Sequence, residues 1–223
     1  MQAFPILHYS NTPLSIVLVR GVKSKISEAG NDDSNDLQGA SMKPMKGNAW
    51  IFRGVLDVDW EICVFEVSHE LQAKGIYTPE EIGKYCMTKV DPDFPKKVKK
   101  GDFIIGEFMG FGHDHDHACL SILGAGVAAV ICETSAPYFL RNSIERGLPV
   151  VELPGILNAV SQGDELEVDF EKGRLTNLST KIELRFEPMP AFILAKLEVG
   201  GMVELLKREV DAGRIPRRLG KPN

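Results

Sequence analysis

Three histidines alternate with two aspartates between residues 113 and 117, directly after a glycine-rich segment. The whole stretch reads Gly106-Glu107-Phe108-Met109-Gly110-Phe111-Gly112-His113-Asp114-His115-Asp116-His117-Ala118. No other part of the chain places so many titratable side chains beside glycine. Imidazoles and carboxylates exchange protons near neutral pH and also bind divalent metals, so chemistry is expected here.

The residues on either side of this stretch predict a strand, a turn and a helix. The strand is Asp102–Ile105, the glycines that follow make the turn, and the helix is Ala118–Ala125. Glycine lets the backbone approach a ligand closely, and the free N–H groups at a helix N-terminus favour carboxylate or phosphate. The arrangement therefore predicts an anion site.

Strand and helix signals alternate from residue 102 to residue 153. The apolar run Val127–Cys132 suits a buried strand, a helix is predicted over Pro137–Arg146, and Leu148–Leu153 is a further buried strand. This alternation is typical of α/β packing. The rhythm then changes, and Glu165–Phe170 begins an antiparallel meander with one solvated face.

The remaining predicted elements are short. A strand opens at Asn48–Phe52, a loop with two aspartates follows at Arg53–Asp59, and a capped helix covers Glu80–Cys86. The last helical stretch, Phe192–Val210, is interrupted at Gly200-Gly201. We therefore divide the chain into a partly flexible extension (1–46), a globular domain (47–211) and a loose tail (212–223).

Composition excludes several classes of protein. The formal net charge of −5 leaves no basic face for nucleic acid, and no apolar run approaches the length of a membrane span. The four cysteines are scattered without a C-x-x-C pair, which argues against an iron–sulfur or zinc site and favours a reducing compartment. Cytoplasmic localisation is expected. Mitochondrial localisation is the alternative, because residues 1–27 contain no acidic side chain.

Six sequence segments, spread in order along the chain, resemble those of a known family. They are Phe52–Asp59 with its D-x-D, Asp91–Asp102, Gly106–Ala118, Arg141–Ile144 with Gly147–Val150, Gly163–Asp169, and Gly200-Gly201. From about Gly47 to Asp211 the chain resembles the small subunit of 3-isopropylmalate dehydratase, the swivel domain of the aconitase superfamily. The resemblance implies a swivelling β/β/α domain that meets a large subunit holding a [4Fe–4S] cluster, with no cofactor in this chain.

The glycine segment departs from the family at the positions that carry chemistry. The family motif resembles G-x-N-F-G-x-G-S-S-R-E-H-A. Its second serine, the catalytic base, corresponds to Asp114, and its arginine, which grips a substrate carboxylate, corresponds to His115. The resemblance therefore implies that the fold carries over and that isopropylmalate itself is not the substrate.

We predict Asp114 and His115 as catalytic residues. A carboxylate such as Asp114 is already ionised at pH 7 and can accept a proton, although a helix cap is the alternative. A neutral imidazole at His115 cannot make the bidentate grip of a guanidinium, so His115 either contacts a less charged substrate group or is itself an acid or base. The substrate-binding candidates are Gly110, Phe111, Gly112, His113, Asp57 and Asp59.

The histidine spacing also allows a metal site. His113 and His117 share one face of a helix, and all three histidines share one side of an extended segment. Either arrangement could bind zinc or another divalent metal. We nevertheless predict no dedicated metal site, because the resemblance already accounts for His117.

Three functions follow from these observations. The first is the small subunit of an aconitase-type hydro-lyase, which adds or removes water in a small hydroxy- or dicarboxylic acid and works only with a large subunit. The second is a non-catalytic swivel domain that binds or regulates a large subunit. The third is a stand-alone metal-dependent hydratase that uses the histidine and aspartate cluster.

Overall fold

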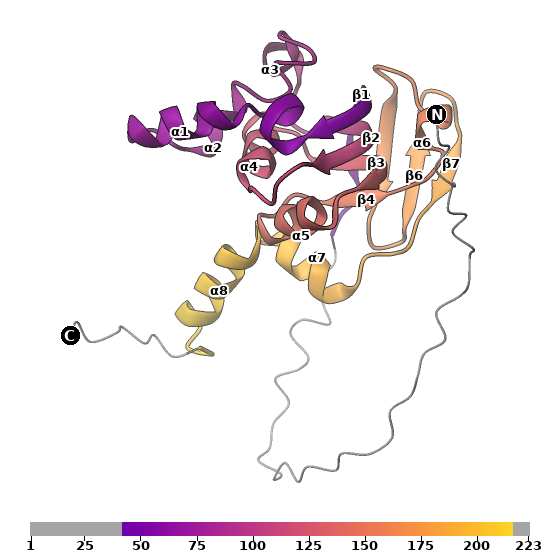
Figure 1. Cartoon of the computed structure of the whole chain (residues 1–223). Coiled ribbons are helices and arrows are strands. Elements are labelled where there is room, and N and C mark those ends of the chain that lie inside the picture. Colours follow the sequence, from indigo (N-terminus) through magenta and orange to yellow (C-terminus); the bar gives the residue numbers. More distant parts are fainter. Residues whose placement is uncertain (1–41, 216–223) are drawn as a thin grey trace, which may run out of the picture. The chain divides into compact units, whose positions relative to one another are not determined.

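The computed structural model describes residues 42–215, in which seven strands form one sheet in the order β4-β3-β2-β1-β5-β6-β7. In one half of the sheet, neighbouring strands run parallel. These strands are β1 (Met45–Asp57), β2 (Phe103–Phe111), β3 (Ala129–Ser135) and β4 (Val150–Glu152). Figure 1 shows β2 between β1 and β3 in this half.

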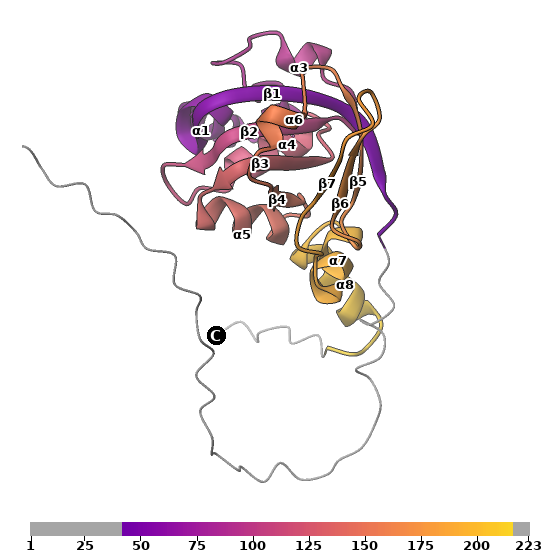
Figure 2. The ribbon, with the colours of Figure 1, turned by 90° about the vertical axis from the view of Figure 1, so that its right-hand side faces the viewer.

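The other half of the sheet is an antiparallel meander. Its strands are β5 (Glu165–Asp169), β6 (Arg174–Asn177) and β7 (Glu183–Arg185). The long strand β1 belongs to both halves, because Met45–Asn48 pairs with β5 and the rest of the strand, from Ala49 onward, pairs with β2. Figure 2 shows β1 as one continuous strand that extends from β2 to the meander.

Helical segments connect the parallel strands and end the described chain. They are the π-helix η2 (Val58–Ile62), α1 (Phe65–Ala73), α2 (Pro79–Gly83), α3 (Phe94–Lys97), α4 (His117–Gly124), α5 (Pro137–Glu145), α6 (Ile156–Ala159), α7 (Ala191–Glu198) and α8 (Met202–Asp211). Within residues 42–215, no helix is both long enough and apolar enough to cross a membrane.

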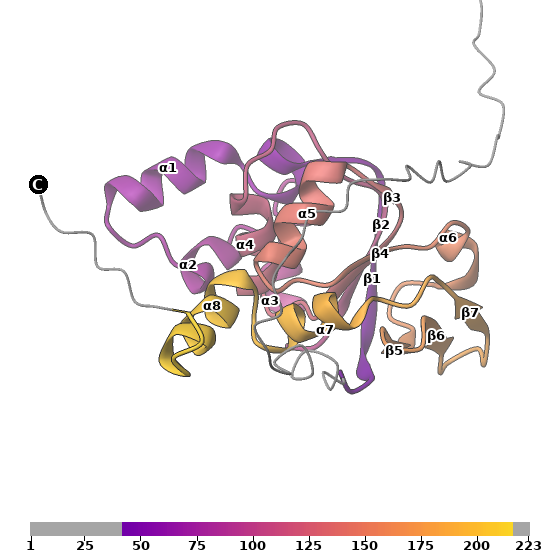
Figure 3. The same cartoon turned by 90° about the horizontal axis from the view of Figure 1, so that it is seen from below.

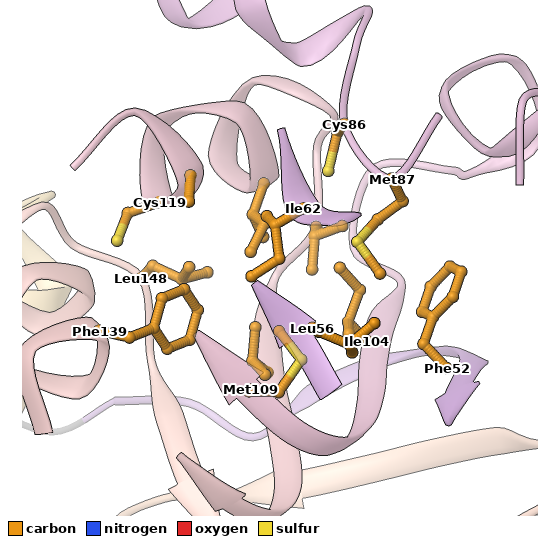
Figure 4. Packing of buried hydrophobic residues seen from close by; sticks show 14 of the residues in the cluster. Phe52, Leu56, Ile62, Cys86, Met87, Ile104, Met109, Cys119, Phe139 and Leu148 are labelled. Atoms are coloured by element: carbon orange, nitrogen blue, oxygen red, sulfur yellow. The ribbon is translucent and has the colours of Figure 1, made fainter. Parts of the chain in front are cut away.

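Two hydrophobic cores lie on opposite faces of the parallel strands. Side chains alternate between the faces of a strand, so Ile104 of β2 enters one core while Phe103 and Ile105 enter the other. The first core packs β1–β4 against η2, α3, α4 and α5 (Figure 4). The second core packs the same strands against α6, α7 and the meander, which lies on the far side of β1–β4 from α1, α2 and α4 (Figure 3).

The predicted α/β alternation is confirmed, and so are the meander and the helix break at Gly200-Gly201. The predicted loop at Arg53–Asp59 is wrong, because β1 continues to Asp57 and η2 begins at Val58. The strand predicted at Asp102–Ile105 instead runs through the glycine segment to Phe111, since β1 and β3 supply partners along that length. Helix α1 was not predicted from the sequence.

The globular part also begins earlier than residue 47. Met42 is buried in the second core, and Met45 and Lys46 pair with β5. Residues 42–46 therefore belong to the globular part and not to the predicted extension. Its remaining residues, 1–41, and residues 216–223 of the predicted tail lie outside the described part of the chain.

Asp102 ties the start of β2 to the middle of β1. Its carboxylate accepts hydrogen bonds from Asn48 N at 3.0 Å, Trp50 Nε1 at 2.9 Å and Lys99 N at 2.9 Å. Burial raises the pKa of Asp102, but these hydrogen bonds outweigh it, so the pKa lies below its ordinary value. The charged form is therefore the one that stabilises the fold.

We expect Asp102→Asn to lower the free energy of unfolding at pH 7 by roughly 2–4 kcal/mol, because an amide leaves buried donors without an acceptor. A group whose pKa is lower in the folded state stabilises the fold fully above its unfolded pKa, here near 3.8. That contribution is lost as the pH falls through the folded pKa. Urea unfolding of the full chain from pH 7 down to pH 3 should therefore show the difference between wild type and variant narrowing below about pH 4.

Asp93→Asn is the matched control, because Asp93 is an exposed aspartate paired with Lys96 and Lys97. Surface pairs of this kind contribute little to stability, so its unfolding midpoint should stay near that of wild type. A loss of stability in Asp102→Asn no larger than in Asp93→Asn would show that Asp102 does not hold the two strands.

Candidate functional site

The pairing of β1 with β2 brings the two predicted site segments together. The strands run parallel, and their register places Asp57 beside Phe111 at their carboxyl ends. The chain leaves β1 into η2, which carries Asp59, and leaves β2 into the loop at residues 112–116. Residues 54 to 58 positions apart in the sequence therefore meet at one edge of the sheet.

Asp59 is the centre of the histidine cluster. Its Oδ2 lies 2.7 Å from His113 Nδ1, and its Oδ1 lies 2.8 Å from His115 Nδ1. An ionised carboxylate can only accept hydrogen bonds, so both imidazoles must carry a proton on Nδ1. The Nε2 atom of His115 then remains available to a substrate, and its side chain is 37% exposed.

His117 is the buried member of the cluster. Its Nε2 donates to the carbonyl oxygen of Cys63 at 2.9 Å and lies 3.7 Å from Asp59 Oδ1. Phe65, the first residue of α1, stacks on His115 with ring centroids 4.5 Å apart and meets His117 edge-on at 5.6 Å. The helix that the sequence did not predict therefore supplies the wall of the site.

The electrostatics of the cluster favour an ionised Asp59. Partial burial raises its pKa, but the hydrogen bonds from His115 and His113 and the charges of His115 and His117 together lower the pKa below the ordinary value. Asp59 is thus an acceptor at neutral pH and orients both imidazoles.

Contacts from α5 and the residue after it reach the two aspartates of the motif. Asn142 Nδ2 donates to the backbone carbonyl of Asp114 at 2.8 Å, and Arg146 pairs with the carboxylate of Asp116. The side chain of Asp114 is exposed and has no hydrogen-bond or charge partner within residues 42–215. The N-cap of α4 is Asp116, so the alternative interpretation of Asp114 as a helix cap is wrong.

The other predicted substrate-binding residues, outside the histidine cluster, make structural contacts with residues of the same domain. Asp57 accepts a hydrogen bond from Asp59 N at 2.7 Å and so caps η2. Gly112 has a φ of 101°, and a side chain there would overlap the Asp57 carboxylate. Gly110, with a φ of 73°, leaves room for the ring of Phe139 on α5. Phe111 meets Phe108 edge-on at 6.3 Å.

The site is open to the surface rather than enclosed. A hollow of about 360 Å³ lies elsewhere, between α5, β4 and the segment before α7, and its lining is mostly apolar. It lies away from the histidine cluster and holds none of its residues. The side chains of His113 and His115 are 76% and 37% exposed, so the cluster faces the surface and this hollow does not enclose it.

The cysteines do not form a cluster-binding site. Burial raises the pKa of Cys63 to about 12 and that of Cys119 to about 11, so these thiols stay protonated. Cys86 and Cys132 are also buried with raised pKa values. No group of three cysteines in residues 42–215, which contain all four, places its sulfur atoms close enough to share a metal. These residues do not fit an iron–sulfur cluster.

Gly112→Ala should disturb the site more than an ordinary glycine replacement does. The left-handed backbone costs a side chain about 1–2 kcal/mol, and displacing the Asp57 carboxylate should add roughly 1–3 kcal/mol. The displaced carboxylate would also lose its bond to Asp59 N. Urea unfolding of the full chain measures the total.

Gly163→Ala provides the comparison, because Gly163 has a similar φ of 83° with no atom close to the added carbon. It should lose only the backbone strain. Equal destabilisation of the two variants would mean that the loop at residues 112–116 does not press on Asp57.

Comparison with known proteins gives consistent relatives, although no model of a known protein family matches the chain. The isopropylmalate/citramalate isomerase small subunit of Methanocaldococcus jannaschii is 41% identical over 167 residues, which cover 74% of this chain and 95% of the relative. The 3-isopropylmalate dehydratase small subunit of Aliarcobacter butzleri is 36% identical over 170 residues, 76% of this chain and 98% of the relative.

A solved structure supports the same relationship. The crystal structure of 3-isopropylmalate dehydratase from Methanocaldococcus jannaschii matches with a TM-score of 0.67 and 28% sequence identity. The match covers 77% of this chain and 99% of that chain. The predicted fold class, an α/β domain of the small-subunit type, is therefore confirmed.

Proposed function

The chain belongs to the family of 3-isopropylmalate dehydratase small subunits, and from this premise we propose that it works only in complex with a large subunit. The complex is an aconitase-type hydro-lyase that adds or removes water in a small hydroxy- or dicarboxylic acid. The exposure of His113 and His115 supports this proposal, because a site open to the surface needs a second protein surface to enclose a substrate.

We place the iron–sulfur cluster of this enzyme in the large subunit. The four buried, protonated cysteines of this chain give a cluster no ligands. The chain contributes protein side chains to the reaction and no cofactor.

Asp114 is the proposed base, and the observation that carries this assignment is its free carboxylate on a fixed backbone. His113 and His115 hold the loop from the η2 side, while Asn142 and Arg146 hold it from the α5 side. The Asp114 side chain between these attachments has no partner within residues 42–215, so it can accept a proton. It would take the proton from the carbon beside a carboxylate as the hydroxyl leaves and the double bond forms.

His115 is proposed to bind the substrate beside Asp114. Its Nδ1 is occupied by Asp59, which fixes the ring and turns Nε2 into the free acceptor. Together with His113, Gly110, Phe111 and Gly112 it would line one side of the substrate site. Asp57 and Asp59 then act by positioning this wall.

The names of the relatives make isopropylmalate and citramalate the first substrates to test. The sequence-based expectation that isopropylmalate is not turned over rests on Asp114 and His115 alone. It stays a prediction, and the names of both relatives include isopropylmalate. We also propose a cytoplasmic location; the mitochondrial alternative rests on residues 1–27, which lie outside the described part of the chain.

An apolar strip beside the site is proposed as part of the surface that meets the large subunit. Val55 of β1 and Phe108 of β2 are register partners, and both are exposed, at 58% and 38%. The Phe108 ring contacts Phe111, which leads into the histidine loop. Exposed apolar side chains that adjoin in this way are typical of protein interfaces.

We expect the purified chain to fold but to show no dehydratase activity until its large subunit is added under anaerobic conditions. Phe108→Ser should weaken the association by about tenfold, because it removes an aromatic contact from the interface. Analytical ultracentrifugation or calorimetry of the two subunits measures the affinity, and absorbance of the unsaturated product measures the activity.

Ile182→Ser is the matched control, since Ile182 is 42% exposed just before β7 on the meander. Its affinity for the large subunit should equal that of wild type. Turnover by the isolated chain would overturn the proposed function. Equal effects of the two variants on affinity would show that the apolar strip is not part of the interface.

Asp114→Asn should lower kcat of the assembled enzyme by roughly 10²–10⁴, because an amide cannot accept the proton. The side chain is exposed and unpaired, so the melting temperature should not change. Steady-state kinetics with 2-isopropylmalate and citramalate, and a melting curve of the same preparation, test both expectations.

Asp93, an exposed aspartate outside the loop, supplies the control. Asp93→Asn breaks surface ion pairs with Lys96 and Lys97 and should change kcat by less than about fivefold. If Asp114→Asn keeps full activity, the base lies elsewhere and the assignment of Asp114 is wrong.

A further inference from the structure

One group of side chains in residues 42–215 has the composition and spacing of a metal site. It consists of Asp59, His115 and His117, each of which offers one ligand atom, and these atoms lie within 4.8 Å of one another. We infer that these three residues bind a divalent transition-metal ion of the Zn²⁺ or Co²⁺ type. This inference goes beyond the proposed function, and it reverses the sequence-based prediction of no metal site.

The ligand types select the kind of ion. Two imidazoles and one carboxylate suit zinc, cobalt, nickel or iron, whereas magnesium and calcium prefer oxygen ligands alone. Ligands bound at zinc's usual distances lie about 3.3 Å apart in a tetrahedral site. Asp59 Oδ1 lies 2.8 Å from His115 Nδ1 and 3.7 Å from His117 Nε2, so small movements bring all three atoms around one ion.

Neighbouring groups orient the ligands before any ion arrives. Phe65 holds the plane of the His115 ring, and His113 donates to the carboxylate oxygen of Asp59 that His115 does not use. The backbone N–H of Asp59 is in turn held by Asp57. Groups that contact the ligands but not the ion typically improve metal affinity by 10- to 100-fold.

Binding of the ion requires both ring protons to move to the other ring nitrogen. His115 Nδ1 now shares its proton with Asp59, and His117 Nε2 shares its proton with the carbonyl of Cys63. An ion can bind at these two atoms only when each neutral ring carries its proton on the other nitrogen, Nε2 of His115 and Nδ1 of His117. The Cys63 carbonyl oxygen, 2.9 Å from His117 Nε2, then lies near the ion as a second oxygen beside that of Asp59.

The site also retains access to solvent. His117 is buried, but the side chain of Asp59 is 19% exposed and that of His115 is 37% exposed. A bound ion therefore has an open coordination position on its outer side, which a water molecule or a carboxylate can occupy.

The test is a titration of tag-free, chelator-treated full-length chain with CoCl₂, followed by the visible absorption of bound Co²⁺ and by calorimetry. We expect one ion per chain and displacement of Co²⁺ by Zn²⁺. His115→Gln should weaken binding by more than about 100-fold because it removes a ligand, while His113→Ala, which removes only support for Asp59, should cost about tenfold.

His69→Gln is the control, because His69 is an exposed histidine whose ring centroid lies 4.4 Å from that of Phe65 but which contributes no ligand. It should bind as tightly as wild type. Circular dichroism checks that each variant folds, and Asp59→Asn adds a second ligand variant. Absence of stoichiometric binding, or equal affinity of His115→Gln and His69→Gln, would overturn the inference. Because no large subunit is present, the outcome is independent of the proposed hydro-lyase activity.

Discussion

The carboxylate of Asp59 accepts hydrogen bonds on both of its oxygens, from His113 on one and from His115 on the other. Asp59 follows β1 and the histidines follow β2, so these bonds fasten two chain segments together where the parallel strands end. His117 completes the attachment through the Cys63 carbonyl. The exposed position of Asp114 and the spacing of the metal ligands both depend on this one carboxylate.

The division of the loop into two sides explains how one short motif can serve two purposes. Odd-numbered residues from 113 to 117 face η2, where they meet Asp59 and the wall made by Phe65. On the α5 side, Asn142 donates to the backbone carbonyl of Asp114 and Arg146 pairs with the carboxylate of Asp116.

Local sequence signals were enough to predict much of the fold. The apolar run Val127–Cys132 marked β3, Pro137 marked the start of α5, and Gly200-Gly201 marked the break between α7 and α8. The histidine and aspartate stretch drew attention by composition alone. Elements that are determined by residues close together in the sequence can be predicted in this way.

Features that depend on contacts between residues far apart in the sequence could not be predicted from the sequence. Gly106–Phe111 looked like a turn because of its glycines, yet pairing with β1 and β3 makes it strand. Helix α1 begins at Phe65 after Val64, which makes no side-chain cap, so the usual start signal is absent. The link from Asp59 to His113 and His115 spans more than 50 residues and has no local trace.

The role of Asp59 can be tested most directly by the proton positions on the histidine rings. Long-range ¹H–¹⁵N correlation spectra at pH 8, where histidine is ordinarily neutral, report which ring nitrogen carries the proton. The account predicts protonated Nδ1 for His113 and His115, protonated Nε2 for His117, and loss of the preference at His113 and His115 in Asp59→Asn. Protonated Nε2 on His115 in the metal-free wild-type chain would contradict it.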